Sequence, residues 1–231
     1  MTDIKGILFD KDGTLFDFRT TWSAWARSFC LGIADGDHAR AAEISAALGY
    51  DYATGSFQKD SVIISATPDD ITADLIALMP EWQPDALLAR INAAAADVPQ
   101  AEPVPLIPLM QRFRAAGLIL GVATNDAEAP ARSHLGRAGI MHLLDFVAGF
   151  DSGFGAKPGT GMQRGFCAKT GLRADQVVMV GDSLHDLVSG RDAGMSTIAV
   201  LTGMAEADEL APYADIVLPH IGEIPDYLRL A

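Results

Sequence analysis

The feature that most constrains the fold is a short apolar run, Ile7-Leu8-Phe9, that ends in Asp10, with Asp12 and Gly13 just beyond it. An unbroken apolar run is typical of a buried strand in a parallel sheet, and ligands collect outside the carboxyl ends of such strands. Side chains of an extended segment alternate with a period of two, so Asp10 and Asp12 can point the same way. Two adjacent carboxylates persist when a cation lies between them or one holds a proton. The run therefore indicates a chemical site, although Asp12-Gly13 is also a common turn.

Five further apolar segments predict strands in the second half of the chain, with helical stretches between most of them. These segments are residues 118–123, 146–149, 177–180, 197–201 and 216–218. Strands that alternate with helices are typical of a doubly wound parallel sheet. The strand at residues 4–9 belongs with them, so the sequence predicts an α/β core built on a Rossmann-like doubly wound parallel sheet.

Residues 18–98 instead show helical periodicity. Apolar residues recur at helical spacing over 22–33 and 37–48, and further helices are predicted to start at Thr67 and Pro84. Four prolines between residues 97 and 108 form a stiff connector, which is typical of a domain boundary. We therefore predict that a small α-helical bundle, the cap (residues 18–98), is inserted into a catalytic core formed by residues 1–17 and 99–231.

Polar residues follow two other predicted strands or lie in loops near them. Thr124 and Asn125 follow residues 118–123, and a hydroxyl with free backbone N–H groups can bind a phosphate oxygen, although both residue types also cap helices. Lys157 precedes Pro158 in a glycine-rich loop and could neutralise both a phosphate and a carboxylate. A lone lysine is more often a solvated surface charge.

A stronger signal follows the strand at residues 177–180, where Asp182 and Asp186 repeat the acidic pattern of the first strand. If a helix starts at Ser183, both carboxylates can face one cation. Sites with few carboxylates and several waters suit Mg²⁺. The alternative interpretation makes Asp182 a helix N-cap and Asp186 a first-turn acid.

Together these segments resemble the four ordered motifs of the haloacid dehalogenase (HAD) superfamily. The motifs are Asp10-Lys11-Asp12-Gly13-Thr14-Leu15, Thr124-Asn125, Lys157-Pro158 and Gly181-Asp182-Ser183-Leu184-His185-Asp186. The position of the helical insert is similar to that in the phosphoglycolate-phosphatase-like branch. One departure is that Gly159-Thr160-Gly161 follows Lys157-Pro158, where the family often has another proline.

The resemblance implies a Mg²⁺-dependent phosphatase that acts on small phosphomonoesters. Asp10 would attack phosphorus to form an aspartyl-phosphate, Asp12 would act as general acid and then base, and Lys157 would hold nucleophile and phosphate in register. The implied phosphate-binding residues are Gly13, Thr124, Asn125 and Lys157. The implied Mg²⁺ ligands are Asp10, Asp12 through its backbone carbonyl, Asp182 and Asp186.

Asp12 discriminates among functions within the superfamily. Dehalogenases lack this second aspartate, and so do phosphonate-cleaving relatives, which use a cap lysine for which Lys59 is the candidate. Sugar-phosphate mutases of the β-phosphoglucomutase type keep both aspartates and remain the alternative. A signalling receiver module, from a different class, is about half as long and has no cap.

Composition and net charge further limit the kinds of partner that the protein can bind. The net charge of −13 argues against nucleic acid, and no apolar run reaches the roughly 18 residues of a membrane span. Cys30 and Cys167 match no metal or redox spacing, which favours free thiols and a cytoplasmic location. We expect a small phosphorylated metabolite as partner, with phosphoglycolate the first guess, and a monomer or homodimer. The segment from Tyr50 to Lys59 is the candidate for substrate selection, and His185 is expected to face solvent.

Overall fold

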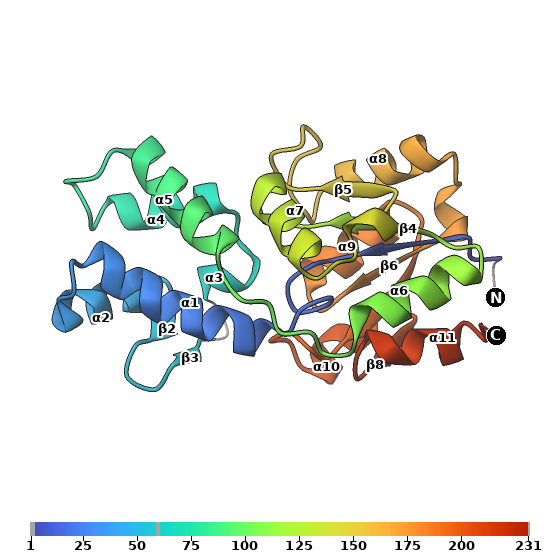
Figure 1. Cartoon of the computed structure of the whole chain (residues 1–231), viewed down its shortest axis with the longest axis horizontal. Coiled ribbons are helices and arrows are strands. Elements are labelled where there is room, and N and C mark those ends of the chain that lie inside the picture. The colour runs from blue at the N-terminus through green and yellow to red at the C-terminus, as the bar shows by residue number, and fades with distance from the viewer. Residues whose placement is uncertain (1–2, 59–60, 231) are drawn as a thin grey trace.

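The structure, a computed structural model, describes residues 3–58 and 61–230 and has a sheet-containing part beside a helical part (Figure 1). Within these residues a parallel sheet has the order β5-β4-β1-β6-β7-β8, and every pairing between neighbours is parallel. This confirms the predicted doubly wound sheet. Its strands are β1 Gly6–Phe9, β4 Ile119–Ala123, β5 Phe146–Ala148, β6 Val177–Gly181, β7 Ser196–Val200 and β8 Ile216–Leu218.

Helices cover both faces of this sheet because the side chains of β1 alternate between two apolar clusters. Ile7 and Phe9 pack in one cluster with α6, whereas Leu8 packs in the other with Phe166 of α8. The helices of this part are α6 Leu106–Ala115, α7 Glu128–Arg137, α8 Gly161–Thr170, α9 Leu184–Asp192, α10 Ala207–Leu210 and α11 Ile224–Tyr227. Short 3₁₀ turns are η1 Met141–Leu143, η2 Ala174–Gln176, η3 Ala211–Tyr213 and η4 Ile221–Glu223.

The strand order reverses at β1, which lies between β4 and β6. In open α/β sheets the crevice for a ligand forms at such a point, outside the carboxyl ends of the strands. Asp10 follows β1 directly, and its N–H still donates to Val180 O of β6 at 2.8 Å. Asp182 follows β6. The two motif aspartates are therefore placed side by side at the crevice.

The helical part contains its own apolar cluster, formed by residues between Phe18 and Val98. Its elements are α1 Phe18–Ile33, α2 His38–Ala47, α3 Val62–Ser65, α4 Pro68–Ile76, α5 Pro84–Ala96 and the antiparallel pair β2 Tyr50–Asp51 and β3 Ser56–Phe57. As the sequence predicted, a helix starts here: Thr67 is the N-cap of α4, and its hydroxyl accepts the Asp70 N–H in a capping box. The division into a cap and a core at residues 17/18 and 98/99 remains a prediction.

Two local features differ from the sequence prediction. The segment after α2, for which no strand was predicted, contains the β2–β3 hairpin. Pro108 is not part of the connector but is the third residue of α6. The first N–H groups of a helix have no intrahelical acceptor, so proline costs no hydrogen bond at this position.

Two crossings join the helical part to the sheet-containing part, and they are hydrogen-bonded to each other. Asp17 N–H donates to Ala101 O at 2.7 Å, and Ala101 N–H donates to Thr21 Oγ1 at 3.3 Å. Phe18 N–H also donates to Thr202 O at 3.2 Å. Both cysteines are free thiols. None of the helices in the described part of the chain combines the length and apolar character needed to cross a bilayer.

Candidate active site

Three buried carboxylates gather at the crevice. Asp10, Asp182 and Asp186 each offer an oxygen, and these oxygens lie within 4.8 Å of one another. Asp10 and Asp182 are held by the ends of β1 and β6, whereas Asp186 projects from the first turn of α9. The structure thus brings together three of the four residues that the sequence predicted as metal ligands.

Lys157 joins this acidic cluster from a loop more than 140 residues away from Asp10. Its buried Nζ donates to Asp10 Oδ1 at 2.5 Å, to Asp186 Oδ1 at 2.6 Å and to Ala123 O at 2.7 Å. Asn125 fixes this loop, because its Oδ1 accepts the Lys157 N–H at 2.8 Å and its Nδ2 donates to Lys157 O at 3.0 Å. The Asn125 side chain therefore positions the lysine.

Burial dominates the electrostatics of the cluster. It raises the pKa of Asp10 to about 7, although the Lys157 ammonium opposes the rise. Burial, reinforced by the charges of Asp10 and Asp186, also raises the pKa of Asp182 well above its usual value. For Lys157, burial lowers the pKa, but the charges of Asp10 and Asp186 outweigh this effect and the net shift is upward. One lysine does not balance three buried carboxylates.

Asp182 lies in a space that glycines leave open. A Cβ added at Gly13 or Gly203 would overlap the Asp182 carboxylate, and Gly13 also has a positive φ of 78° that disfavours other residues. The Thr14 hydroxyl donates to Asp182 Oδ1 at 3.4 Å, which is a long hydrogen bond. Gly13, predicted to bind phosphate, thus packs against the neighbouring carboxylate.

Asp186 is anchored on both oxygens. Its Oδ2 accepts the Ser183 N–H at 3.1 Å and the Ser183 hydroxyl at 2.6 Å, while its Oδ1 accepts from Lys157. Ser183, not Asp182, is the N-cap of α9. Asp186 is therefore a first-turn acid of α9, as the alternative interpretation predicted, and the same carboxylate also belongs to the acidic cluster. Its role as a metal ligand stays a prediction.

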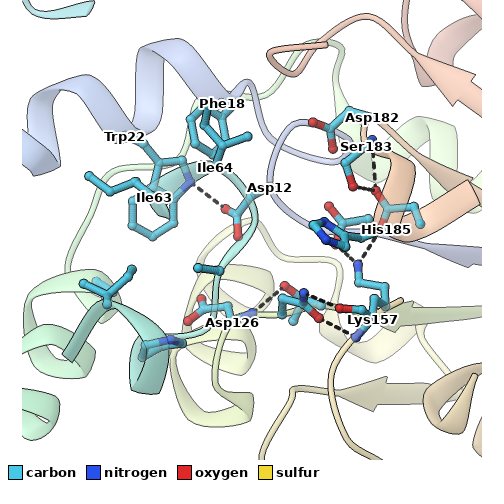
Figure 2. A pocket seen from close by; sticks show the side chains of 18 of the residues that line it. Asp12, Phe18, Trp22, Ile63, Ile64, Asp126, Lys157, Asp182, Ser183 and His185 are labelled. Carbon is cyan, nitrogen blue, oxygen red and sulfur yellow. Dashed lines mark hydrogen bonds and ion pairs between the residues drawn. The ribbon is translucent and has the colours of Figure 1, made fainter. Parts of the chain in front are cut away.

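The Asp12 carboxylate is not part of the acidic cluster and points toward other partners. Lys11 Nζ lies 2.6 Å from Asp12 Oδ2. Figure 2 shows the second contact, in which Trp22 Nε1 of α1 donates to Asp12 Oδ1 at 2.9 Å. Asp12 still lines the same cavity as Asp10. Thr124, buried beside them, accepts the Asp126 N–H at 3.0 Å, and a hydroxyl that accepts a bond can still donate one.

Sequence reasoning missed the partners of Lys11. This residue is fully buried, and its ammonium lies 3.2 Å from Asp126 Oδ2 and 3.2 Å from His134 Nδ1. His134 Nε2 lies 2.8 Å from Ala95 O of α5, so Nε2 carries the hydrogen and Nδ1 accepts from Lys11. Burial, and then the Lys11 charge, lower the pKa of His134 to about 4, which keeps the imidazole neutral. The sequence did carry a signal for these contacts, because Lys11 stands between the motif residues Asp10 and Asp12.

A cavity above the carboxylates separates them from the helical part. Apart from Asp10, Asp12, Lys157 and their neighbours, it is lined by residues of α1, α3, α4 and α5 and of the short α3–α4 link. His185 was expected to face solvent, but it is half-buried and lines the cavity. Of the predicted selection segment, none of residues 50–58 lines the cavity, and Lys59 lies outside the described residues.

Buried carboxylates and a lysine at the switch point of a parallel α/β sheet are typical of the ligand site of a doubly wound α/β protein. The model of the family described as haloacid dehalogenase-like hydrolase matches residues 7–200. The chain belongs to this family. It is therefore an enzyme of the HAD hydrolase type, which confirms the superfamily predicted from the four motifs and makes the receiver-module alternative wrong.

Individual relatives carry phosphatase names. The phosphoglycolate phosphatase of Rhodospirillum rubrum is 30% identical over 122 residues, which is 53% of this chain and only 51% of that protein. The N-acetylmuramic acid 6-phosphate phosphatase of Pseudomonas aeruginosa is 27% identical over 235 residues, covering 99% of this chain and 96% of that protein. A solved structure, described as a predicted phosphoglycolate phosphatase from Haemophilus somnus, shares the fold with a TM-score of 0.74, 20% identity and 99% coverage of both chains.

Proposed function

We propose that this chain is a Mg²⁺-dependent phosphatase that hydrolyses small phosphomonoesters through an aspartyl-phosphate on Asp10. The observation that carries the proposal is the buried cluster of Asp10, Asp182 and Asp186 joined by Lys157 at the switch point of the sheet. Phosphatase names among the relatives that match the chain support the same conclusion.

The donor set fits a divalent cation. All three cluster side chains offer carboxylate oxygens, which are the ligands that Mg²⁺ prefers. Asp182 is buried, and the hydrogen bond that its carboxylate accepts from the Thr14 hydroxyl is long, so its charge is poorly compensated by protein groups. Asp10, Asp182, Asp186 and the backbone carbonyl of Asp12 would hold the ion. When bound, Mg²⁺ supplies positive charge that lets an anionic phosphoryl group approach the carboxylates.

In the proposed reaction an Asp10 carboxylate oxygen attacks phosphorus, and the bond from phosphorus to the alcohol oxygen breaks. Asp12 gives its proton to the departing alcohol and later takes one from the water that hydrolyses the aspartyl-phosphate. Lys11 and Trp22 fix the Asp12 side chain at the edge of the cavity, as general acid–base catalysis requires. The alcohol and inorganic phosphate are the products.

Phosphate binding is assigned to groups on the β4 and Lys157 loops. The Thr124 hydroxyl and the Asn125 backbone N–H would donate to phosphoryl oxygens, and the Lys157 ammonium would neutralise charge on both phosphate and Asp10. The hydrogen bonds between Asn125 and the Lys157 backbone keep these donors in one arrangement. Catalysis then consists mostly of positioning and charge neutralisation.

The test is phosphate release from a panel of phosphomonoesters, with and without Mg²⁺. We expect Asp10→Asn to abolish release while its circular dichroism and thermal unfolding remain those of a folded protein, and the exposed Asp97→Asn to serve as a matched control. Turnover retained by Asp10→Asn would refute the assignment. A hexose 1-phosphate converted to its isomer, instead of to free phosphate, would favour the mutase. The cytoplasmic location and the monomeric or homodimeric state stay predictions.

A further inference from the structure

The cavity above the acidic cluster has two chemically different walls. The core wall carries the charges, and the opposite wall comes from the helices of residues 18–98. Figure 2 shows this opposition, with Lys157, Asp182 and His185 facing the apolar side chains across the cavity. The principal side chains of the second wall, called here the apolar wall, are Phe18, Trp22, Trp25, Ile63, Ile64 and Ile71.

The apolar wall offers no charge to a ligand. Every cavity-lining residue that the described part of residues 18–98 contributes is apolar or a tryptophan. The Trp22 indole N–H is used by Asp12, and the Trp25 indole N–H has no hydrogen-bond partner among the residues that the structure describes. Lys157 is the one lysine or arginine among the described lining residues, and its ammonium is already held by Asp10 and Asp186.

The position of the reacting group decides which part of a substrate meets this wall. Because the phosphoryl group must reach Asp10 on the core wall, the alcohol part of the ester is directed to the opposite side. A carboxylate placed there would lose water without gaining a counter-ion, which is unfavourable. An uncharged hydrocarbon group would instead release water from the aromatic and isoleucine surfaces, which is favourable in proportion to the area covered.

Resting on the proposed phosphatase function, we propose that the substrates are phosphate monoesters whose alcohol part is an uncharged aromatic or branched aliphatic group. This group packs against Phe18, Trp22 and Trp25 while the phosphate meets the core wall. Phosphoglycolate, with its second anionic group, fits this wall poorly.

Matched ester pairs test the inference on the wild-type protein. Benzyl phosphate and 4-carboxybenzyl phosphate differ mainly in one charge, and we expect kcat/KM to favour the uncharged ester by more than about tenfold. In the series from ethyl to pentyl phosphate, kcat/KM should rise by up to about fourfold for each methylene buried. Phosphoglycolate and p-nitrophenyl phosphate complete the panel.

Variants of the apolar wall supply the second readout. Ile64 is half-buried in α3 at the edge of the apolar cluster of the helical part, so Ile64→Lys places an ammonium at the cavity, and thermal unfolding checks that the variant remains folded. This variant should lose activity on benzyl phosphate and gain activity on its carboxylated partner. Leu78→Lys adds the same charge at an exposed position of the helical part that does not line the cavity, and it should keep the wild-type preference. Lys59→Met should keep it as well.

The outcomes separate the two proposals. If the wild-type protein hydrolyses 4-carboxybenzyl phosphate or phosphoglycolate faster than the uncharged esters, or if rates do not depend on alkyl length, the inference about the alcohol group is wrong and the phosphatase function stands. If no ester in the panel releases phosphate with Mg²⁺ present, the phosphatase function itself is wrong. Removal of the preference by Lys59→Met would show that residue 59, and not the apolar wall, selects the substrate.

Discussion

Replacing Lys11 with methionine should destabilise the protein by about 3–5 kcal/mol at neutral pH, the cost of leaving a buried charge without its partner. Methionine keeps most of the volume but removes the ammonium that lies 2.6 Å from Asp12 and 3.2 Å from Asp126. Because the Asp12 side chain is 16% exposed and water can reach it, while that of Asp126 is only 7% exposed, we expect a value near 3 kcal/mol.

The loss of stability caused by Lys11→Met should depend on pH, and the burial of Asp126 determines whether it grows or shrinks as pH rises. Burial raises the pKa of Asp126 even though the Lys11 ammonium lowers it, so removal of Lys11 raises that pKa further. A carboxyl group whose pKa is higher in the folded than in the unfolded state favours folding while protonated, and this stability is lost as pH rises through the folded-state pKa. The penalty of Lys11→Met should therefore be largest near pH 8 and shrink toward pH 5.

Urea unfolding followed by far-ultraviolet circular dichroism measures this penalty at several pH values. Lys5→Met is the matched control, because Lys5 is half-exposed and its ion pair with Asp3 lies at the surface; it should change stability by less than about 0.5 kcal/mol. Adding Asp126→Asn to Lys11→Met should recover a large part of the loss. A loss below about 1 kcal/mol, or the same loss at pH 5 and pH 8, would contradict the reasoning.

Three other predictions follow from the site and the helical part. Asp182→Asn should raise the stability of the metal-free protein, because a buried carboxyl with a raised pKa becomes a neutral amide, and should abolish stabilisation by added Mg²⁺; thermal unfolding against Mg²⁺ concentration measures both effects. Mg²⁺ affinity should increase from pH 6 to pH 8, since Asp10, with a pKa of about 7, must lose its proton to bind; calorimetric titration at several pH values should show this, and a flat profile would exclude it. Thr67→Ala should cost about 1 kcal/mol in urea unfolding through loss of the α4 cap, whereas Thr67→Ser should cost little.

The sequence was informative wherever the signal is local. Apolar strands that end in acids located Asp10 and Asp182, because both the strand and its polar end lie within a few adjacent residues. Proline and capping residues located the start of α4 in the same way. The predicted sheet and the gathering of three acids follow from such signals, combined with the rule that parallel strands meet at one edge.

Long-range side-chain pairing could not be predicted from one sequence. Lys11 and His134 are 123 positions apart, and nothing near either residue specifies that they touch or that His134 then reaches Ala95 O of the helical part. The side-chain role of Asn125 was missed for the same reason, since its partner Lys157 is 32 positions away. The Asp12 carboxylate departs from simple alternation because β1 ends at Phe9 and the backbone bends at Lys11.

The hydrogen-bonded crossings near Asp17 and Ala101 make the two connections of the helical part into one joint. Trp22 lies one turn of α1 beyond these crossings, and its indole N–H donates to Asp12. The hydrogen bonds that pair the two crossings therefore also help to hold the Asp12 side chain at the cavity.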